Sequence, residues 1–175
     1  MIVAKPNLVL WQVGTNFVLR DHPLDARGTL LHEGIAHLKA TDTDVVLIDP
    51  QFAPKVIVKP GLEHMLALLS EVARTEKVNL FHRYSMMQRW YVSDKLSFRA
   101  FLSPDGLHMN DWSYSCLAQG LALAISDAAT RGHREVPPGA VTKILHQPFH
   151  HRARQEPEAD RGTLRVKRVS SRRNQ

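Results

Sequence analysis

The sequence has little cysteine and no long apolar run, and each absence excludes a class of structure. It contains a single cysteine, Cys116, which excludes an internal disulfide and any metal site built from several cysteines. Its most apolar stretch, around residues 8–13, is far shorter than the roughly 20 residues that a membrane span needs. Met1–Pro6 leads directly into this stretch without the pattern of a secretion signal, so the sequence favours no particular compartment.

The net charge of +6 is distributed unevenly along the chain. Residues 1–130 contain 12 lysines and arginines against 13 aspartates and glutamates, whereas residues 131–175 contain 11 against 4. The basic residues therefore belong to the C-terminal segment, which we expect to be a largely disordered tail. Contact of this tail with an acidic surface is the alternative.

Residues 1–130 also lack the alternation of aromatic and basic residues that stacks on bases, so we expect no nucleic-acid partner. The short apolar stretch leads us to expect no membrane span. The same residues alternate between patterns typical of strands and of helices. The predicted strands cover residues 7–13, 44–50 and 78–81. The predicted helices cover residues 29–41, 61–76, 81–90 and 112–129. This order indicates an α/β domain with a parallel sheet and right-handed crossovers.

Two details of these elements are also predicted. The first strand is almost continuously apolar, which is typical of a parallel strand buried on both faces. Asp111 directly precedes the last helix and is its expected N-cap.

A glycine and an asparagine follow the first predicted strand, in Gly14-Thr15-Asn16. Reactive groups of an open parallel sheet lie beyond the carboxyl ends of its strands. Gly14 permits a tight turn there, and an asparagine amide aimed at a developing oxyanion is worth about 10²–10³ in rate. An ordinary turn with a capping asparagine is the alternative interpretation.

An aspartate and a histidine lie three residues apart just before the last predicted helix, in Ser103-Pro104-Asp105-Gly106-Leu107-His108. At this spacing the Asp105 carboxylate can accept a hydrogen bond from Nδ1–H of His108. Such a bond fixes the tautomer and leaves Nε2 able to act as a general base. A surface loop with a capping aspartate is the alternative.

Together, the two segments resemble conserved blocks of the SGNH/GDSL hydrolases. Asp105–Tyr114 is similar to the closing motif of that family, in which an aspartate precedes the catalytic histidine by three residues. Trp11–Asn16 is similar to the block whose asparagine supplies an oxyanion-hole donor. The resemblance covers about residues 5–130, and we expect residues 1–130 to form a partial hydrolase domain of this type.

The resemblance implies both a fold and a set of roles. The fold would be flavodoxin-like, with three layers, α/β/α. Asn16 and Gly14 would form the oxyanion hole, His108 would be the general base, and Asp105 would orient it. The resemblance implies no cofactor.

The serine nucleophile of that family has no counterpart in this sequence. In the family it belongs to a Gly-Asp-Ser motif after the first strand, and neither Gly-Asp-Ser nor any Gly-x-Ser occurs here. Ser103 precedes a proline in a loop, and Ser113 and Ser115 follow His108 in the last predicted helix, so we predict no nucleophile in the chain. We expect the first strands of the fold to be missing, an apolar sheet edge to be left open, and the motif to be encoded upstream of Met1.

Two groups of histidines bear on metal binding. In His32-Glu33-Gly34-Ile35-Ala36-His37 the second histidine comes one residue too late for the zinc-protease motif, a displacement of about 100° around a helix. His146, His150 and His151 form a loose cluster in the tail. We predict no metal site at either place.

Two functions remain open. The first is a serine ester hydrolase that acts on a small molecule or an acylated carbohydrate or lipid and transfers the acyl group to water. The second is a non-catalytic remnant, or a module of the same fold that binds a ligand or partner. The spacing of Asp105 and His108 favours the first, because a remnant has no physical reason to keep an orienting aspartate.

Overall fold

The structure is a computed structural model that describes residues 6–20 and 27–131. The expected basic tail, with the cluster of His146, His150 and His151, lies outside the described residues apart from Arg131. Within the described ranges, no helix combines the length and the apolar character needed to cross a membrane.

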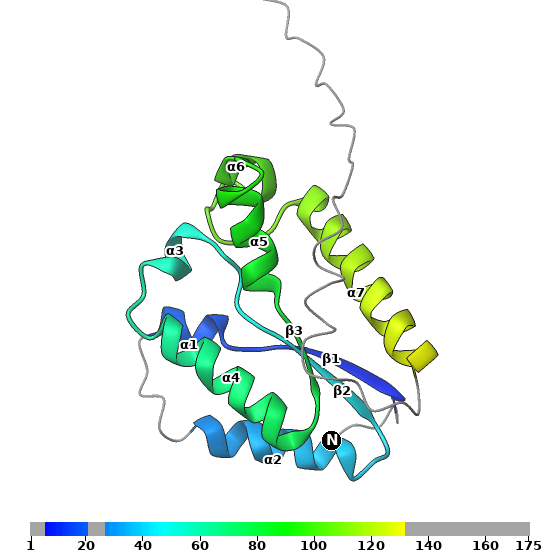
Figure 1. Cartoon of the computed structure of the whole chain (residues 1–175). Helices are drawn as coiled ribbons and strands as arrows, with labels where there is room; N and C mark the ends of the chain where they lie inside the picture. Colours follow the sequence, from blue (N-terminus) through cyan, green and yellow to red (C-terminus); the bar gives the residue numbers. More distant parts are fainter. Residues whose placement is uncertain (1–5, 21–26, 132–175) are drawn as a thin grey trace, which may run out of the picture.

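Three parallel strands form the sheet, in the order β1-β2-β3 (Figure 1). They are β1 Leu8–Gln12, β2 Asp44–Ile48 and β3 Asn79–Phe81. Leu10 pairs with Val46, and Val46 pairs in turn with Asn79. The carboxyl ends of all three strands therefore lie at one edge of the sheet, and the three predicted strands and their parallel arrangement are confirmed.

Long helices cover both faces of this sheet (Figure 1). The helices α2 Arg27–Lys39 and α4 Leu62–Glu76 lie on one face, where the main core contains fully buried Ile35, Leu47 and Met65. The helix α7 Asp111–Arg131 lies on the other face. A Cβ on Gly120 of α7 would lie 3.2 Å from the Phe81 ring, so helix and sheet touch directly there. The layered α/β/α arrangement matches the predicted fold class.

Four shorter helices stand around the carboxyl ends of the strands. They are α1 Thr15–Leu19, α3 Pro54–Ile57, α5 Arg83–Val92 and α6 Phe98–Phe101. Of these, α5 was predicted over 81–90, whereas the other three were not predicted. The three helices that were not predicted contain only four or five residues each, too few to show a helical period of apolar residues.

The first strand departs from its prediction. In the part of the chain that the structure describes, β1 pairs with β2 alone, and Leu8 and Leu10 on one face are 36% and 45% exposed. Trp11 on the opposite face packs against α2, where a Cβ on Gly34 would lie 2.6 Å from its ring. The prediction that this strand is buried on both faces is therefore wrong, whereas the expected open apolar edge is present.

The N-cap of α7 also differs from its prediction. The backbone N–H of Ser113 donates a hydrogen bond to Oδ1 of Asn110, with N and O 3.0 Å apart. Asn110 therefore caps the helix, and Asp111 is its first helical residue. Asparagine and aspartate are both good N-caps, so the sequence did not distinguish Asn110 from Asp111, and the prediction was one position too late.

Candidate active site

The turn after β1 requires a glycine. Gly14 has φ 99° and ψ −40°, a conformation that L side chains rarely adopt. A Cβ at this position would lie 3.0 Å from Cγ of Pro50 and 3.1 Å from Cγ of Met65. The Gly14 carbonyl accepts the backbone N–H of Val18 at 3.0 Å, which begins α1. The glycine thus turns the chain sharply and places Asn16, which is exposed, in the first turn of α1.

The loop that contains Asp105 and His108 is held together by its own hydrogen bonds. Oδ1 of Asp105 accepts the backbone N–H groups of Leu107 and His108, each at 3.0 Å. Oδ2 of Asp105 bonds to Nδ1 of His108. The Ser103 backbone N–H donates to the His108 carbonyl at 2.8 Å, and Gly106 has φ 66°. The predicted contact between the aspartate and the imidazole is therefore present, and it leaves Nε2 on the far side of the ring.

The charge state of Asp105 follows from these contacts. The hydrogen bond from His108, together with the two backbone N–H groups, lowers the pKa of the Asp105 carboxyl to about 2. The carboxylate is therefore ionised at neutral pH, where it can hold a proton on Nδ1 and stabilise an imidazolium.

One cleft is lined by residues of both predicted segments. It has a volume of about 380 Å³. One wall contains Gly14 and Asn16, and another contains His108. The lining residues are Trp11, Gln12, Val13, Gly14, Thr15, Asn16, Phe17, Leu30, Leu31, Gln51, Leu107 and His108. The structure thus brings together three of the four residues singled out from the sequence, and the fourth, Asp105, supports His108 from outside the cleft.

The cleft has no side chain suited to nucleophilic attack in an ester hydrolase of this type. Among the described residues that line it there is no serine or cysteine. Thr15 is buried, and its hydroxyl donates to Oε1 of Gln51 at 2.7 Å. This agrees with the sequence, which contains no Gly-x-Ser motif.

A buried polar network that the sequence patterns did not predict lies beneath the cleft. Arg83 is 1% exposed; its Nε donates to the Asp49 carbonyl at 2.9 Å and its Nη2 donates to Oε1 of Gln51 at 3.0 Å. Burial lowers the pKa of Arg83 to about 10, and the nearby Asp49 charge opposes that shift. Asp49 and Gln51 follow the carboxyl end of β2, where functional groups of parallel sheets gather. The position of these two residues at the end of a predicted strand was the sequence signal that could have identified them.

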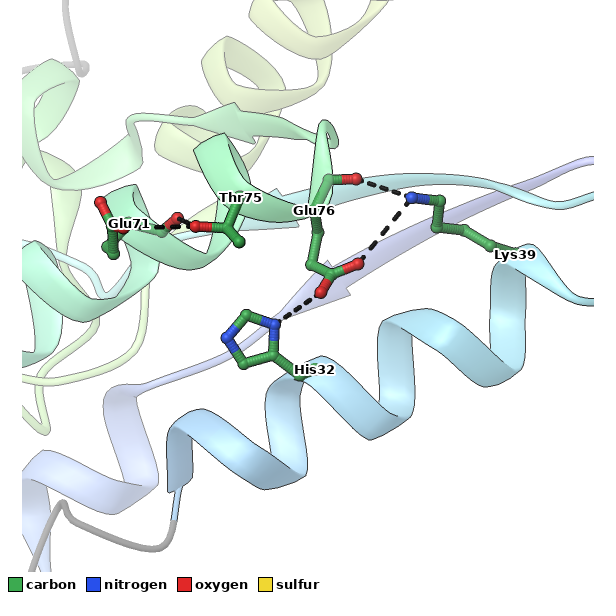
Figure 2. Close-up of polar contacts among 5 residues, drawn as sticks. All are labelled: His32, Lys39, Glu71, Thr75 and Glu76. Atoms are coloured by element: carbon green, nitrogen blue, oxygen red, sulfur yellow. Dashed lines mark hydrogen bonds and ion pairs between the residues drawn. The ribbon is translucent and has the colours of Figure 1, made fainter.

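His32 contacts a neighbouring helix. Its Nδ1 lies 2.6 Å from Oε1 of Glu76, a contact between α2 and α4 that Figure 2 shows as a dashed line. Lys39 also reaches Glu76, with Nζ 2.7 Å from its backbone carbonyl. In the next turn back, the Thr75 hydroxyl donates to the Glu71 carbonyl at 2.9 Å. His32 therefore ties two helices together on the face of the sheet opposite α7.

Comparison with known proteins gives a family match and several structural matches. The model of a non-GDSL lipase-like family matches residues 1–131. A comparison with curated proteins found no match. Among solved structures, the chain is similar to Axe2, an acetylxylan esterase from Geobacillus stearothermophilus, with 16% identity and a TM-score of 0.55 over 79% of this chain and 65% of that one.

A second structural match is the psychrotrophic esterase EstA from Pseudoalteromonas sp., solved with monoethylphosphonate as inhibitor. It has 18% identity and a TM-score of 0.55 over 73% of this chain and 65% of that one. At these identities the likeness concerns the fold. The chain spans less than two thirds of the length of both structures. The α/β fold implied by the resemblance to SGNH/GDSL hydrolases is confirmed.

Proposed function

Because the chain belongs to the non-GDSL lipase-like family, we propose that it carries the acid–base and oxyanion-binding parts of a serine ester hydrolase. The observation that carries this proposal is the cleft lined by Gly14, Asn16 and His108, with Asp105 bonded to the other side of the imidazole. The serine would come from outside the 175 residues, because the sequence contains no Gly-Asp-Ser motif and no described residue that lines the cleft is a serine.

The proposed reaction is acyl transfer in two steps. The serine oxygen attacks the ester carbonyl while Nε2 of His108 takes its proton, and Asp105 stabilises the imidazolium. Asn16 and the Gly14 backbone N–H donate to the oxyanion. The C–O bond to the alcohol then breaks, and His108 gives the alcohol its proton. Water then attacks the acyl carbon while His108 takes its proton, the bond to the serine oxygen breaks, and His108 returns the proton to that oxygen as the acid leaves.

We further propose that the substrate is a small acyl ester of a carbohydrate. A cleft of about 380 Å³ lies at the small end of ligand sites, which run from about 300 to 1,000 Å³. Its lining offers Trp11 and Phe17 as apolar surface beside the polar side chain of Gln12, a mixture that suits a sugar ring. The acetylxylan esterase activity of the structural relative supports the same substrate class.

A phosphonate probe tests this function. The polypeptide carrying the 175 residues together with its upstream segment is treated with an alkyl fluorophosphonate, and the labelled residue is located by mass spectrometry. We expect one labelled serine upstream of Met1, and turnover of acetylated xylooligosaccharides. His108→Ala should abolish labelling and lower kcat by about three orders of magnitude or more, since the serine then lacks its base. The proposal would be contradicted if the polypeptide were neither labelled nor active, or if the His108→Ala variant were active.

The alternative is a binding module of the same fold. The observation that favours it is the absence of a serine or cysteine from the described lining of the cleft. In that case the 175-residue chain would bind an acetylated xylooligosaccharide and release it intact. Calorimetry would measure binding, and an acetate assay would measure release, for the polypeptide with and without its upstream segment. Binding without acetate release in both would select this alternative.

A further inference from the structure

We propose that Gln51 is a positioning residue that fixes the Gly14–Asn16 turn relative to the Asp105–His108 loop. The effect of this positioning on catalysis rests on the proposed function. The contacts of Gln51 do not, so the positioning role and the proposed function can be tested separately.

Gln51 contacts both walls of the cleft from below. Its side chain is buried, with 5% of the residue exposed. Oε1 accepts a hydrogen bond from Oγ1 of Thr15 at 2.7 Å, and Nε2 donates to the Leu107 carbonyl at 3.3 Å. Thr15 directly precedes Asn16, and Leu107 directly precedes His108. One amide therefore joins the backbone segments that carry the oxyanion donor and the base.

The orientation of this amide is set by Arg83. Its Nη2 donates to the same Oε1 at 3.0 Å, and its Nε is fixed by the Asp49 carbonyl. Rotating the amide by half a turn would place an NH₂ group against a guanidinium and against the Thr15 hydroxyl donor, so the observed orientation is the one in which every group has a partner. The NH₂ end must then face Leu107.

The link matters because the two walls of the cleft are anchored to different parts of the fold. The turn at Gly14 is anchored to β1 and α4, whereas the loop of His108 is closed by its own hydrogen bonds and precedes α7 on the other face of the sheet. Misplacing a catalytic group by about 1 Å can cost about 10²-fold in rate. A buried amide that contacts both segments is well placed to prevent this.

Gln51→Glu separates the two halves of the contact. A carboxylate at this position still accepts from Thr15 and Arg83, and it stays ionised beside the guanidinium. It has no N–H for the Leu107 carbonyl, however, and presents an oxygen to it instead. The variant should therefore keep the fold and the Gly14 wall while it releases the loop of His108.

The first measurement is NMR on the ¹⁵N-labelled 175-residue chain. In Gln51→Glu we expect the amide signals of Leu107 and His108 to move and their order parameters to fall from about 0.85 towards 0.6. The signals of α4 should stay unchanged. Changes confined to residues next to position 51 would overturn the proposal.

A second pair of variants decides the question if Gln51→Glu does not fold. Thr15→Val removes the hydroxyl and keeps the branched shape, whereas Thr15→Ser keeps the hydroxyl. We expect Thr15→Val to change the amide chemical shifts of Leu107 and His108, which lie on the opposite side of the cleft. We expect Thr15→Ser to leave these chemical shifts unchanged. Equal effects of the two variants would overturn the proposal.

The kinetic measurement uses the polypeptide with its nucleophile. Gln51→Glu should lower kcat by about 10- to 100-fold and leave KM within about twofold, because alignment of the base is lost while substrate contacts remain. A change in KM alone would make Gln51 a substrate-binding residue and overturn the positioning role. A wild-type polypeptide without any esterase activity would sink the proposed function, and the NMR result would still decide the role of Gln51.

Discussion

The Asp105 carboxylate serves both the shape of its loop and the state of His108. One oxygen accepts two backbone N–H groups of the loop, and the other bonds to Nδ1 of the imidazole. All three contacts favour the ionised form, which is why the pKa falls from 3.8 to about 2. The ordered loop and the charged state therefore depend on each other.

This coupling predicts how the stability of the loop changes with pH. Between pH 3.8 and about 2 the folded carboxyl stays ionised while the unfolded one takes up a proton, so stability falls as pH falls through this window. Above it, the contribution is fully present. Asp105→Asn lacks this titration, and the difference in unfolding free energy between the wild type and this variant should shrink as urea unfolding is repeated from pH 5 down to pH 2. A constant difference would show that the carboxylate is not held by these bonds.

At the scale of elements, the turn from β1 into α1 predicts a difference between two glycines. Gly14→Ala forces a side chain into φ 99° and against Pro50 and Met65; such backbone strain costs about 1–3 kcal/mol, and overpacking adds about 1–3 kcal/mol. At Gly106, φ is 66° and a Cβ would meet nothing within 4 Å. Gly106→Ala should therefore cost only the left-handed penalty of about 1–2 kcal/mol.

Urea unfolding of the two variants at neutral pH measures both free energies under the same conditions. Equal losses of stability would mean that the contacts around Gly14 relax without cost. Because Gly106 lies in the loop of His108 and Gly14 in the opposite wall of the cleft, the comparison also reports which wall depends more on its backbone geometry.

The elements differ in how far the sequence predicts them. Apolar strands and long amphipathic helices leave a periodic signal, and both were found within two or three residues of their ends. The two segments of the site were also predictable, because each follows a recognisable strand or precedes a recognisable helix. Gln51 and Arg83 were not, since Gln51 meets partners that lie 36, 32 and 56 positions away along the chain. Only the folded sheet brings these residues together.

At the scale of the whole molecule, the sheet is layered unevenly. The face towards α2 and α4 is well covered, with Leu47 fully buried and Val45 nearly so. On the other face, α7 packs over Phe81 of β3, while Leu8 and Leu10 of β1 stay partly exposed at the edge. An apolar edge strand with unpaired backbone groups is a template for pairing with another chain.

This edge predicts concentration-dependent self-association of the 175-residue chain through β1. Leu10→Lys should weaken it, because a charge on an edge strand opposes pairing, and stability should change little at a side chain that is already 45% exposed. Val58→Lys is the matched control: it adds the same charge at a residue 74% exposed, just after α3 and away from the sheet. Sedimentation velocity over a range of concentrations measures the effect. If both lysines reduce association equally, net charge rather than the β1 edge governs it, and the role assigned to this edge is wrong.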